Sequence, residues 1–188
     1  MKTNSSPISY SKEDIWRGST YLKILSFFLE RPKAEFYSRE VSKKVGVSSG
    51  AANEKLKELY GAGFMNRRKE GRMYFYSLKK DDETVKQLKV ARNLSKPLVK
   101  DLKKLGRELD LEVYLYGSVA RGEDRKDSDW DVLFIGDASS AELQRKVDEI
   151  DSSVDISTSL FTRSEWNQTE EEDSAFYERV ERDRIRLI

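Results

Sequence analysis

The chain has 188 residues, which is enough for one ordinary domain or two small ones. It contains neither cysteine nor histidine, and this excludes disulfides, thiolate or imidazole metal sites, and acid–base catalysis by histidine. Any catalytic metal must therefore bind to oxygen ligands, which favours Mg²⁺ or Mn²⁺. No apolar run approaches the roughly 20 residues of a membrane helix, and residues 1–11 lack the apolar segment of a signal peptide. We therefore expect a cytoplasmic protein without membrane contact.

The net charge of +1 conceals an uneven distribution along the chain. Residues 1–80 contain 17 basic and 8 acidic side chains, whereas residues 106–188 contain 11 basic and 22 acidic ones. A basic half joined to an acidic half indicates two domains with different partners. Ordinary solvated surface is the simpler alternative.

Three helices are predicted in the first half. Residues 19–30 are apolar on nearly every side, which is typical of a buried helix. Ser38 is expected to cap a short second helix that Gly46 ends, and residues 47–49 form a tight turn. The inward stripe of the third helix is formed by Ala52, Leu56 and Leu59.

A basic hairpin follows the third helix. Residues 64–68 and 72–78 have the composition of strands, and residues 69–71 are predicted to form the turn between them. Gly71 supplies the positive φ that such a turn needs. The first half is therefore expected to be mostly helical, with one β-hairpin.

This order resembles the winged helix-turn-helix domain of MarR-like and ArsR-like regulators. The resemblance covers roughly residues 15–80 and is carried by the phrase SREVSKKVGVSSGAANEKLKELYGAGFMNRRKEGRMYFYSL. It implies double-stranded DNA as a partner, with the third helix in the major groove and a basic wing on phosphates. The expected DNA-binding residues are Ser49, Asn53, Lys57, Arg67, Arg68, Lys69 and Arg72. Docking to another protein is the alternative use of such a domain.

The two halves are joined by a polar, helical segment at residues 81–94, and Pro97 then restarts a helix. Such a segment either supports a homodimer or begins the next domain. We divide the chain into a DNA-binding domain at 1–80, a linker at 81–95 and a second domain at 96–188.

In the second half, a predicted strand at residues 111–116 runs directly into Gly117 and Ser118, and a helix follows. A strand that leads through glycine into a helix start forms an anion site, because free backbone N–H groups point outward there. A helix within residues 139–150, a final helix capped by Thr162 and a terminal strand at 184–188 complete a predicted α/β domain with a mixed sheet.

Two carboxylates begin the next predicted strand. Asp129 and Asp131 are two residues apart, so they project from the same face, while Trp130 faces the other side. Adjacent carboxylates repel each other unless a divalent cation lies between them. Asp155 lies in an apolar run at residues 153–160, where an acid is costly unless it is paired or binds a metal. Asp151 lies nearby and is an alternative to it.

The phrase YGSVARGEDRKDSDWDVLFI resembles the signature of the DNA polymerase beta nucleotidyltransferase superfamily, and its minimal nucleotidyltransferase (MNT) members look most similar. The resemblance covers about residues 97–188. It implies that Gly117 and Ser118 bind the triphosphate of an NTP, with ATP as the expected one. It also implies catalytic roles as Mg²⁺ ligands for Asp129, Asp131 and Asp155. Arg121 either contacts phosphate or forms an ion pair with Glu123.

The resemblance implies transfer of a nucleoside monophosphate to an acceptor. The acceptor is either a partner protein, as for antitoxins that modify HEPN-type toxins, or a small molecule. The alternatives are a transcriptional regulator whose transferase fold only senses nucleotide, an adaptor that binds proteins through both domains, and a domain that has lost turnover.

Overall fold

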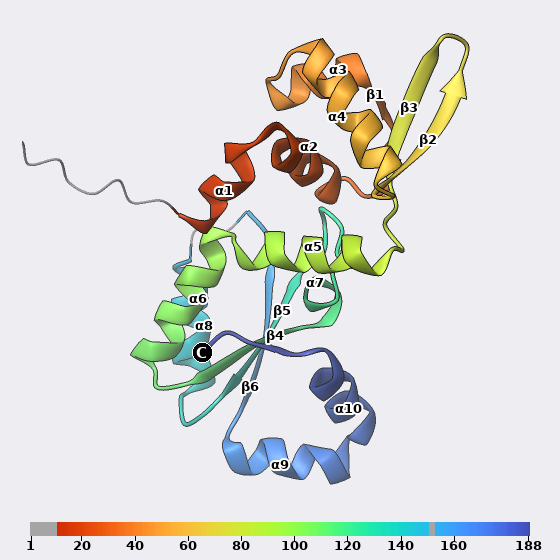
Figure 1. The fold of residues 1–188 in the computed structure, drawn as a ribbon. Helices are drawn as coiled ribbons and strands as arrows, with labels where there is room; N and C mark the ends of the chain where they lie inside the picture. The colour runs from red at the N-terminus through yellow and green to blue at the C-terminus, as the bar shows by residue number, and fades with distance from the viewer. Residues whose placement is uncertain (1–10, 151–152) are drawn as a thin grey trace, which may run out of the picture.

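The computed structural model describes residues 11–150 and 153–188, and within them it has an N-terminal and a C-terminal unit (Figure 1). The N-terminal unit packs helices against a small antiparallel sheet with the strand order β1-β3-β2. Its elements are α1 (Lys12–Gly18), α2 (Thr20–Leu29), β1 (Phe36–Tyr37), α3 (Ser38–Val45), α4 (Ser49–Gly61), β2 (Met65–Glu70) and β3 (Met73–Leu78).

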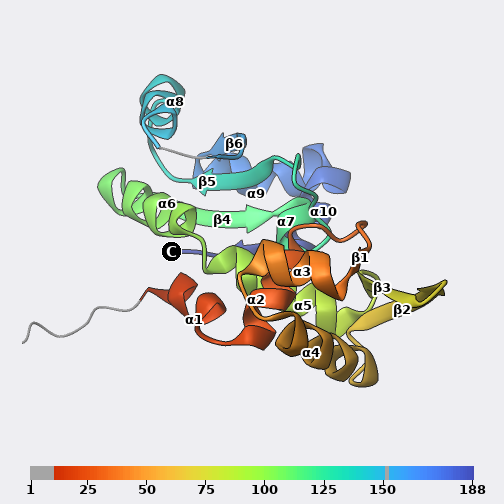
Figure 2. The ribbon, with the colours of Figure 1, turned by 90° about the horizontal axis from the view of Figure 1, so that it is seen from above.

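The N-terminal elements form because their apolar residues meet in one core. The side chains of Ile24, Phe28, Val41 and Leu56 are fully buried in it. The predicted helices and the two hairpin strands are all present. In Figures 1 and 2, the β2–β3 hairpin projects away from the rest of the molecule.

Two local predictions in this unit are wrong. Ser38 does not cap α3; the helix starts at Ser38, and the preceding backbone N–H of Tyr37 donates to Glu40 at 3.1 Å. The hairpin turn is shorter than predicted, because Glu70 still pairs with Met73. A positive φ of 57° at Gly71 lets the chain reverse within two residues, so the strands extend further.

Helix α5 (Glu83–Leu94) contacts both units, and α6 (Pro97–Glu108) follows it after a short break. Val85 of α5 packs in the N-terminal core. One to two turns later, Lys89 and Asn93 bind Asp124 of the C-terminal unit, with an Asn93 Nδ2 to Asp124 Oδ1 distance of 2.9 Å. The predicted linker is therefore a packed helix between the units (Figure 1).

The C-terminal unit is built on a four-stranded mixed sheet with the order β6-β5-β4-β7. β5 is parallel to β6 and antiparallel to β4, and β4 is antiparallel to β7. The elements are β4 (Glu112–Tyr116), α7 (Gly117–Ala120), β5 (Trp130–Ile135), α8 (Ser140–Asp148), β6 (Ile156–Phe161), α9 (Arg163–Glu172), α10 (Ser174–Asp183) and β7 (Ile185–Arg186).

The two faces of this sheet have separate cores. Trp130, Val132 and Phe134 point to the face that α6 and α8 cover. Leu133 and Ile135 point to the other face, where they pack with residues of α9 and α10. This alternation follows from the two-residue period of a strand. It confirms the prediction that Trp130 and the Asp131 side chain lie on opposite sides.

Two predictions about the later elements need correction. β6 begins at Ile156, so Asp155 immediately precedes the strand and is exposed. Because Asp155 is not buried, the cost of burying an acid is no argument that it must be paired or bind a metal. Thr162 caps α9 with a reciprocal Glu165 contact as predicted, but α9 is followed by another helix, α10. Within the described residues, no helix is long and apolar enough to span a membrane.

Candidate active site

The turn between β4 and α7 brings the backbone against a carboxylate. Tyr116, the last residue of β4, pairs with Asp131 of β5, and Gly117 then adopts a φ of 71°. A Cβ atom on Gly117 would overlap the Asp131 carboxylate, so both the backbone angle and the close approach require glycine here.

Helix α7 has only four residues, and no side chain in the described part of the chain caps its first turn. A helix this short has a small dipole, so any attraction for an anion comes from its uncapped N–H groups. Ser118 is half-buried in this turn, and its carbonyl accepts from Glu123 N–H at 2.9 Å. The hydroxyl-bearing residue and the glycine therefore lie where the sequence predicted an anion site.

Asp129 and Asp131 form the acidic part of the site. Asp129 is exposed immediately before β5, and Asp131 is half-buried within it. Burial raises the pKa of the Asp131 carboxyl, and the nearby charge of Asp129 raises it further. Among the described residues, no side chain forms an ion pair with either carboxylate. The two acids thus repel each other without a bound cation.

Asp155 lies beside this pair through the parallel pairing of β5 with β6. Its carbonyl oxygen accepts from Trp130 N–H at 2.9 Å, and the register places position 155 opposite Asp129. However, the described residues contain no group of three or more acidic side chains that could hold a metal. The predicted third-ligand role of Asp155 therefore stays a prediction, and its alternative Asp151 lies outside the described residues.

Arg121 follows α7 and is engaged by two carboxylates. Its Nε donates to Glu123 at 2.9 Å, and its Nη1 donates to Asp183 of α10 at 2.6 Å. The ion pair with Glu123 that the sequence offered is present. Asp183 is an additional partner, and its side chain is only 6% exposed. The ion pairs join the motif turn to α10, while a contact of Arg121 with phosphate stays a prediction.

Arg179 of α10 is a site residue that sequence reasoning missed. It lies one helical turn before Asp183, on the same face, and its charge lowers the pKa of Asp131 against the two raising effects. Its guanidinium lies 5.4 Å from the Phe176 ring centroid. No local motif marks this arginine, because only the packing of α10 beside α7 brings it near Asp131.

Comparison with known families supports a transferase activity in the second half of the chain. Residues 95–183 match the family model described as a nucleotidyltransferase domain. The matched residues include the Gly117 turn, Asp129 before β5, Asp131 within it, and Arg179. It supports nucleotide transfer in general terms. A search of curated proteins gave no match for the chain.

Outside the matched residues 95–183, the residues predicted to bind DNA are all exposed. They are Ser49, Asn53 and Lys57 on α4, and Arg67, Arg68, Lys69 and Arg72 on the hairpin. Ser49 Oγ lies 3.2 Å from Ser42 Oγ. The predicted residues are therefore accessible to a partner, and their binding to DNA stays a prediction.

The wing arginines differ in their surroundings. Arg68 forms ion pairs with Glu35 at 3.0 Å and with Glu70 at 2.5 Å. Arg67 instead lies over the rings of Tyr60 and Tyr74, at 4.3 and 4.5 Å from their centroids. Neighbouring strand residues point to opposite faces, so these arginines do not form one patch.

Proposed function

We propose that residues 96–188 transfer a nucleoside monophosphate from an NTP to an acceptor, with a divalent cation held by Asp129 and Asp131. The observation that carries the proposal is a pair of carboxylates that form no ion pair with any described side chain, beside the turn at Gly117. Oxygen ligands of this kind suit Mg²⁺ or Mn²⁺, and phosphate oxygens of the NTP would complete the shell. The family match at residues 95–183 supports the same chemistry.

Each part of the site has a separate task in this proposal. The cation supplies charge neutralisation for the transferring phosphoryl group. The uncapped N–H groups at Gly117 and Ser118 bind phosphate oxygens, and the close approach of Asp131 to Gly117 holds the cation site next to them. Arg179 adds positive charge from α10 on the side of Asp131.

Asp155 is proposed to serve the acceptor side of the site. Its register position opposite Asp129 and its exposure leave its carboxylate accessible to an incoming acceptor. A role as a further cation ligand that activates the acceptor oxygen is compatible with that position. Asp155→Asn should therefore lower turnover while NTP binding is retained.

The test is transfer of label from an α-labelled NTP, with Mg²⁺, to a lysate and to purified candidate acceptors. Wild type should label an acceptor and release pyrophosphate, whereas Asp129→Ala and Asp131→Ala should lose both products. Asp137→Asn is the matched control, because it removes an exposed acid just beyond the other end of β5. Equal labelling by wild type and Asp131→Ala would contradict the proposal. A partner protein, including a HEPN-type toxin, and a small molecule are both candidate acceptors.

We also propose that the N-terminal unit is a winged helix that binds duplex DNA. The supporting observations are the exposed polar start of α4 and the hairpin with Arg67 and Lys69 exposed on one face. Affinity measured by fluorescence anisotropy should fall steeply with salt, as expected for contacts to phosphates. Binding that is absent at low salt would instead favour a protein-docking module.

The same observations support one alternative function. If NTP binding alters DNA affinity while no acceptor is labelled by wild type, the protein is a regulator that senses nucleotide. The packed helix α5 between the units gives such coupling a physical route, because Val85 packs in the N-terminal core and Leu94 packs against the C-terminal core.

A further inference from the structure

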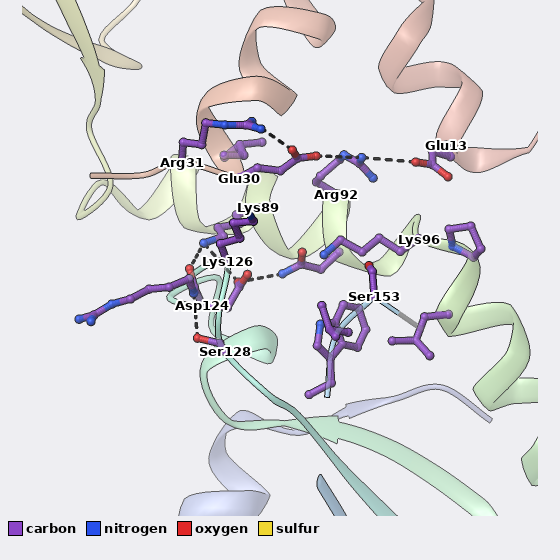
Figure 3. Close-up of a pocket in the computed structure, with 17 residues that line it drawn as sticks. Glu13, Glu30, Arg31, Lys89, Arg92, Lys96, Asp124, Lys126, Ser128 and Ser153 are labelled. Carbon is purple, nitrogen blue, oxygen red and sulfur yellow. Dashed lines mark hydrogen bonds and ion pairs between the residues drawn. The ribbon is translucent and has the colours of Figure 1, made fainter. Parts of the chain in front are cut away.

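A cationic cavity lies between the two units, away from the carboxylate face of β5. Its volume is about 610 Å³, and it is lined by residues of α1, α2, α5, α6 and the loop after α7. Cavities of roughly 300–1,000 Å³ are the usual size for small-molecule sites. Figure 3 shows its walls, with Arg92 at the upper side and Asp124 and Ser128 on the left.

The lining of this cavity has more positive than negative charge. Six lysine and arginine side chains line it, against the three carboxylates of Glu13, Glu30 and Asp124. Each carboxylate is already used: Glu13 and Glu30 bind Arg92 at 3.5 and 3.3 Å, and Asp124 binds Lys89 at 3.4 Å. Three cations therefore remain in excess of the acids along the lining.

Lys96 is the cation that most needs an anionic partner. It forms no ion pair among the residues that the structure describes, and its Nζ lies 5.1 Å from the Trp130 ring centroid. Burial lowers its pKa, with the charges of Arg92 and Lys89 acting in the same direction against Asp124 and Glu30. In Figure 3, its side chain extends into the space between α5 and Ser153.

Arg92, which lines the same cavity, also lacks a partner for one of its polar atoms among the described residues. Its side chain is 9% exposed, and its Nη1 has no hydrogen-bond partner among the described residues. Buried donors without partners are uncommon in folded proteins, so such a group indicates a missing acceptor. Arg125 and Lys126, both exposed, line the cavity as well and add charge for an incoming anion.

We propose that this cavity binds a phosphate group, either free or carried by a small phosphomonoester, with Lys96 as the principal contact. The Trp130 indole beside Lys96 offers an apolar surface for the rest of such a molecule. The site is separate from the transferase site, because Trp130 points away from the face of Asp131. A bound molecule would contact α2, α5 and the strand that carries the catalytic acids.

The test is calorimetric titration of the full chain with inorganic phosphate and, separately, with adenosine monophosphate, in EDTA and at constant ionic strength. Lys96→Gln removes the charge and leaves a polar side chain that is one atom shorter beside Trp130. Loss of one charge-assisted hydrogen bond should weaken binding of both probes about tenfold. Lys100→Gln is the control, because it removes an exposed charge one turn further along α6, outside the cavity. Its affinity should equal that of wild type.

The variants also separate this site from the proposed transferase site. Asp131→Asn should lose nucleotide transfer and keep phosphate binding in EDTA. Since Lys96 is desolvated, Lys96→Gln should melt at or above the temperature of wild type without phosphate. Lys126→Gln should weaken binding about twofold to fivefold, as expected for an exposed charge.

The proposal is overturned if millimolar phosphate does not bind wild type, or if Lys96→Gln binds both probes as Lys100→Gln does. Tighter binding of adenosine monophosphate than of phosphate would identify a phosphomonoester as the ligand, and equal binding the free anion.

Discussion

The two units use charged residues in different ways. In the C-terminal unit, Asp131 lies in β5 and Asp129 immediately before it, and neither has an ion-pair partner among the described side chains. In the N-terminal unit, the basic residues spread over α4 and the hairpin, and Arg68 is already neutralised by two glutamates. A catalytic metal site needs charged side chains without ion-pair partners at a fixed position, whereas a DNA-binding surface tolerates basic side chains that are spread out. Single substitutions should therefore have large effects in one unit and small effects in the other.

The largest effect is expected at the Gly117 turn. Gly117→Val should weaken NTP binding about 100-fold, because overlap with the Asp131 carboxylate adds to about 1–2 kcal/mol of backbone strain. Ser118→Ala should weaken it only about twofold, since the backbone N–H groups of the turn remain. Titration with NTP and Mg²⁺ measures both affinities. Equal affinities for the two variants would show that the turn does not hold the triphosphate.

A smaller effect is expected at Arg179. Arg179→Ala should lower kcat/KM for the NTP about fivefold, as for the loss of one exposed charge contact. It should also raise the pKa of Asp131, because the Arg179 charge lowers that pKa in the wild type. The pH at which Mg²⁺ binding is half-lost should therefore move upward. Arg145→Ala, on exposed α8 surface, is the control and should change neither quantity.

The hairpin should respond more weakly to each substitution. Arg67→Ala should reduce DNA affinity several-fold, about 1 kcal/mol, and lower the salt dependence by about one phosphate contact. Arg68→Ala should have less effect, because Glu35 and Glu70 already neutralise its charge. Anisotropy at several salt concentrations separates the two. The reverse order would indicate that those glutamates release Arg68 when DNA binds.

The smallest effect is expected on stability without metal. The raised pKa of Asp131 means that its ionised form opposes folding at neutral pH, and this opposition fades as the pH falls through that pKa. Asp131→Asn should therefore keep or slightly raise the melting temperature at neutral pH in EDTA. The difference from wild type should shrink in acid. A melting temperature that falls at neutral pH would mean that the carboxylate supports the fold.

Features of the fold whose geometry is determined by a local sequence pattern could be predicted from the sequence. The Gly117 turn and the opposite facing of Trp130 and Asp131 follow from backbone sterics and the period of a strand, and both are present. The facing of Asp129, which precedes the strand, stays a prediction. The predicted hairpin strands are present for the same reason, although their turn is shorter.

Long-range packing accounts for what the sequence did not predict. Arg179 and Asp183 approach the motif only because α10 packs against α7, which no short pattern encodes. Asp155 was placed inside a strand because Val154 and Ile156 flank it, yet β6 starts one residue later and leaves it exposed. The cavity around Lys96 depends on how the two units dock on α5, so it required the structure.

The most direct test of the proposed transferase site is the coupling between metal and nucleotide binding. Calorimetry should show weak Mg²⁺ binding to the full chain alone and tighter binding with NTP, since triphosphate oxygens complete the coordination shell of two carboxylates. Asp131→Asn should lose most of this coupling, and Asp137→Asn should keep it. Coupling that is unchanged in Asp131→Asn would contradict a metal–nucleotide site on the Asp129 and Asp131 face of β5.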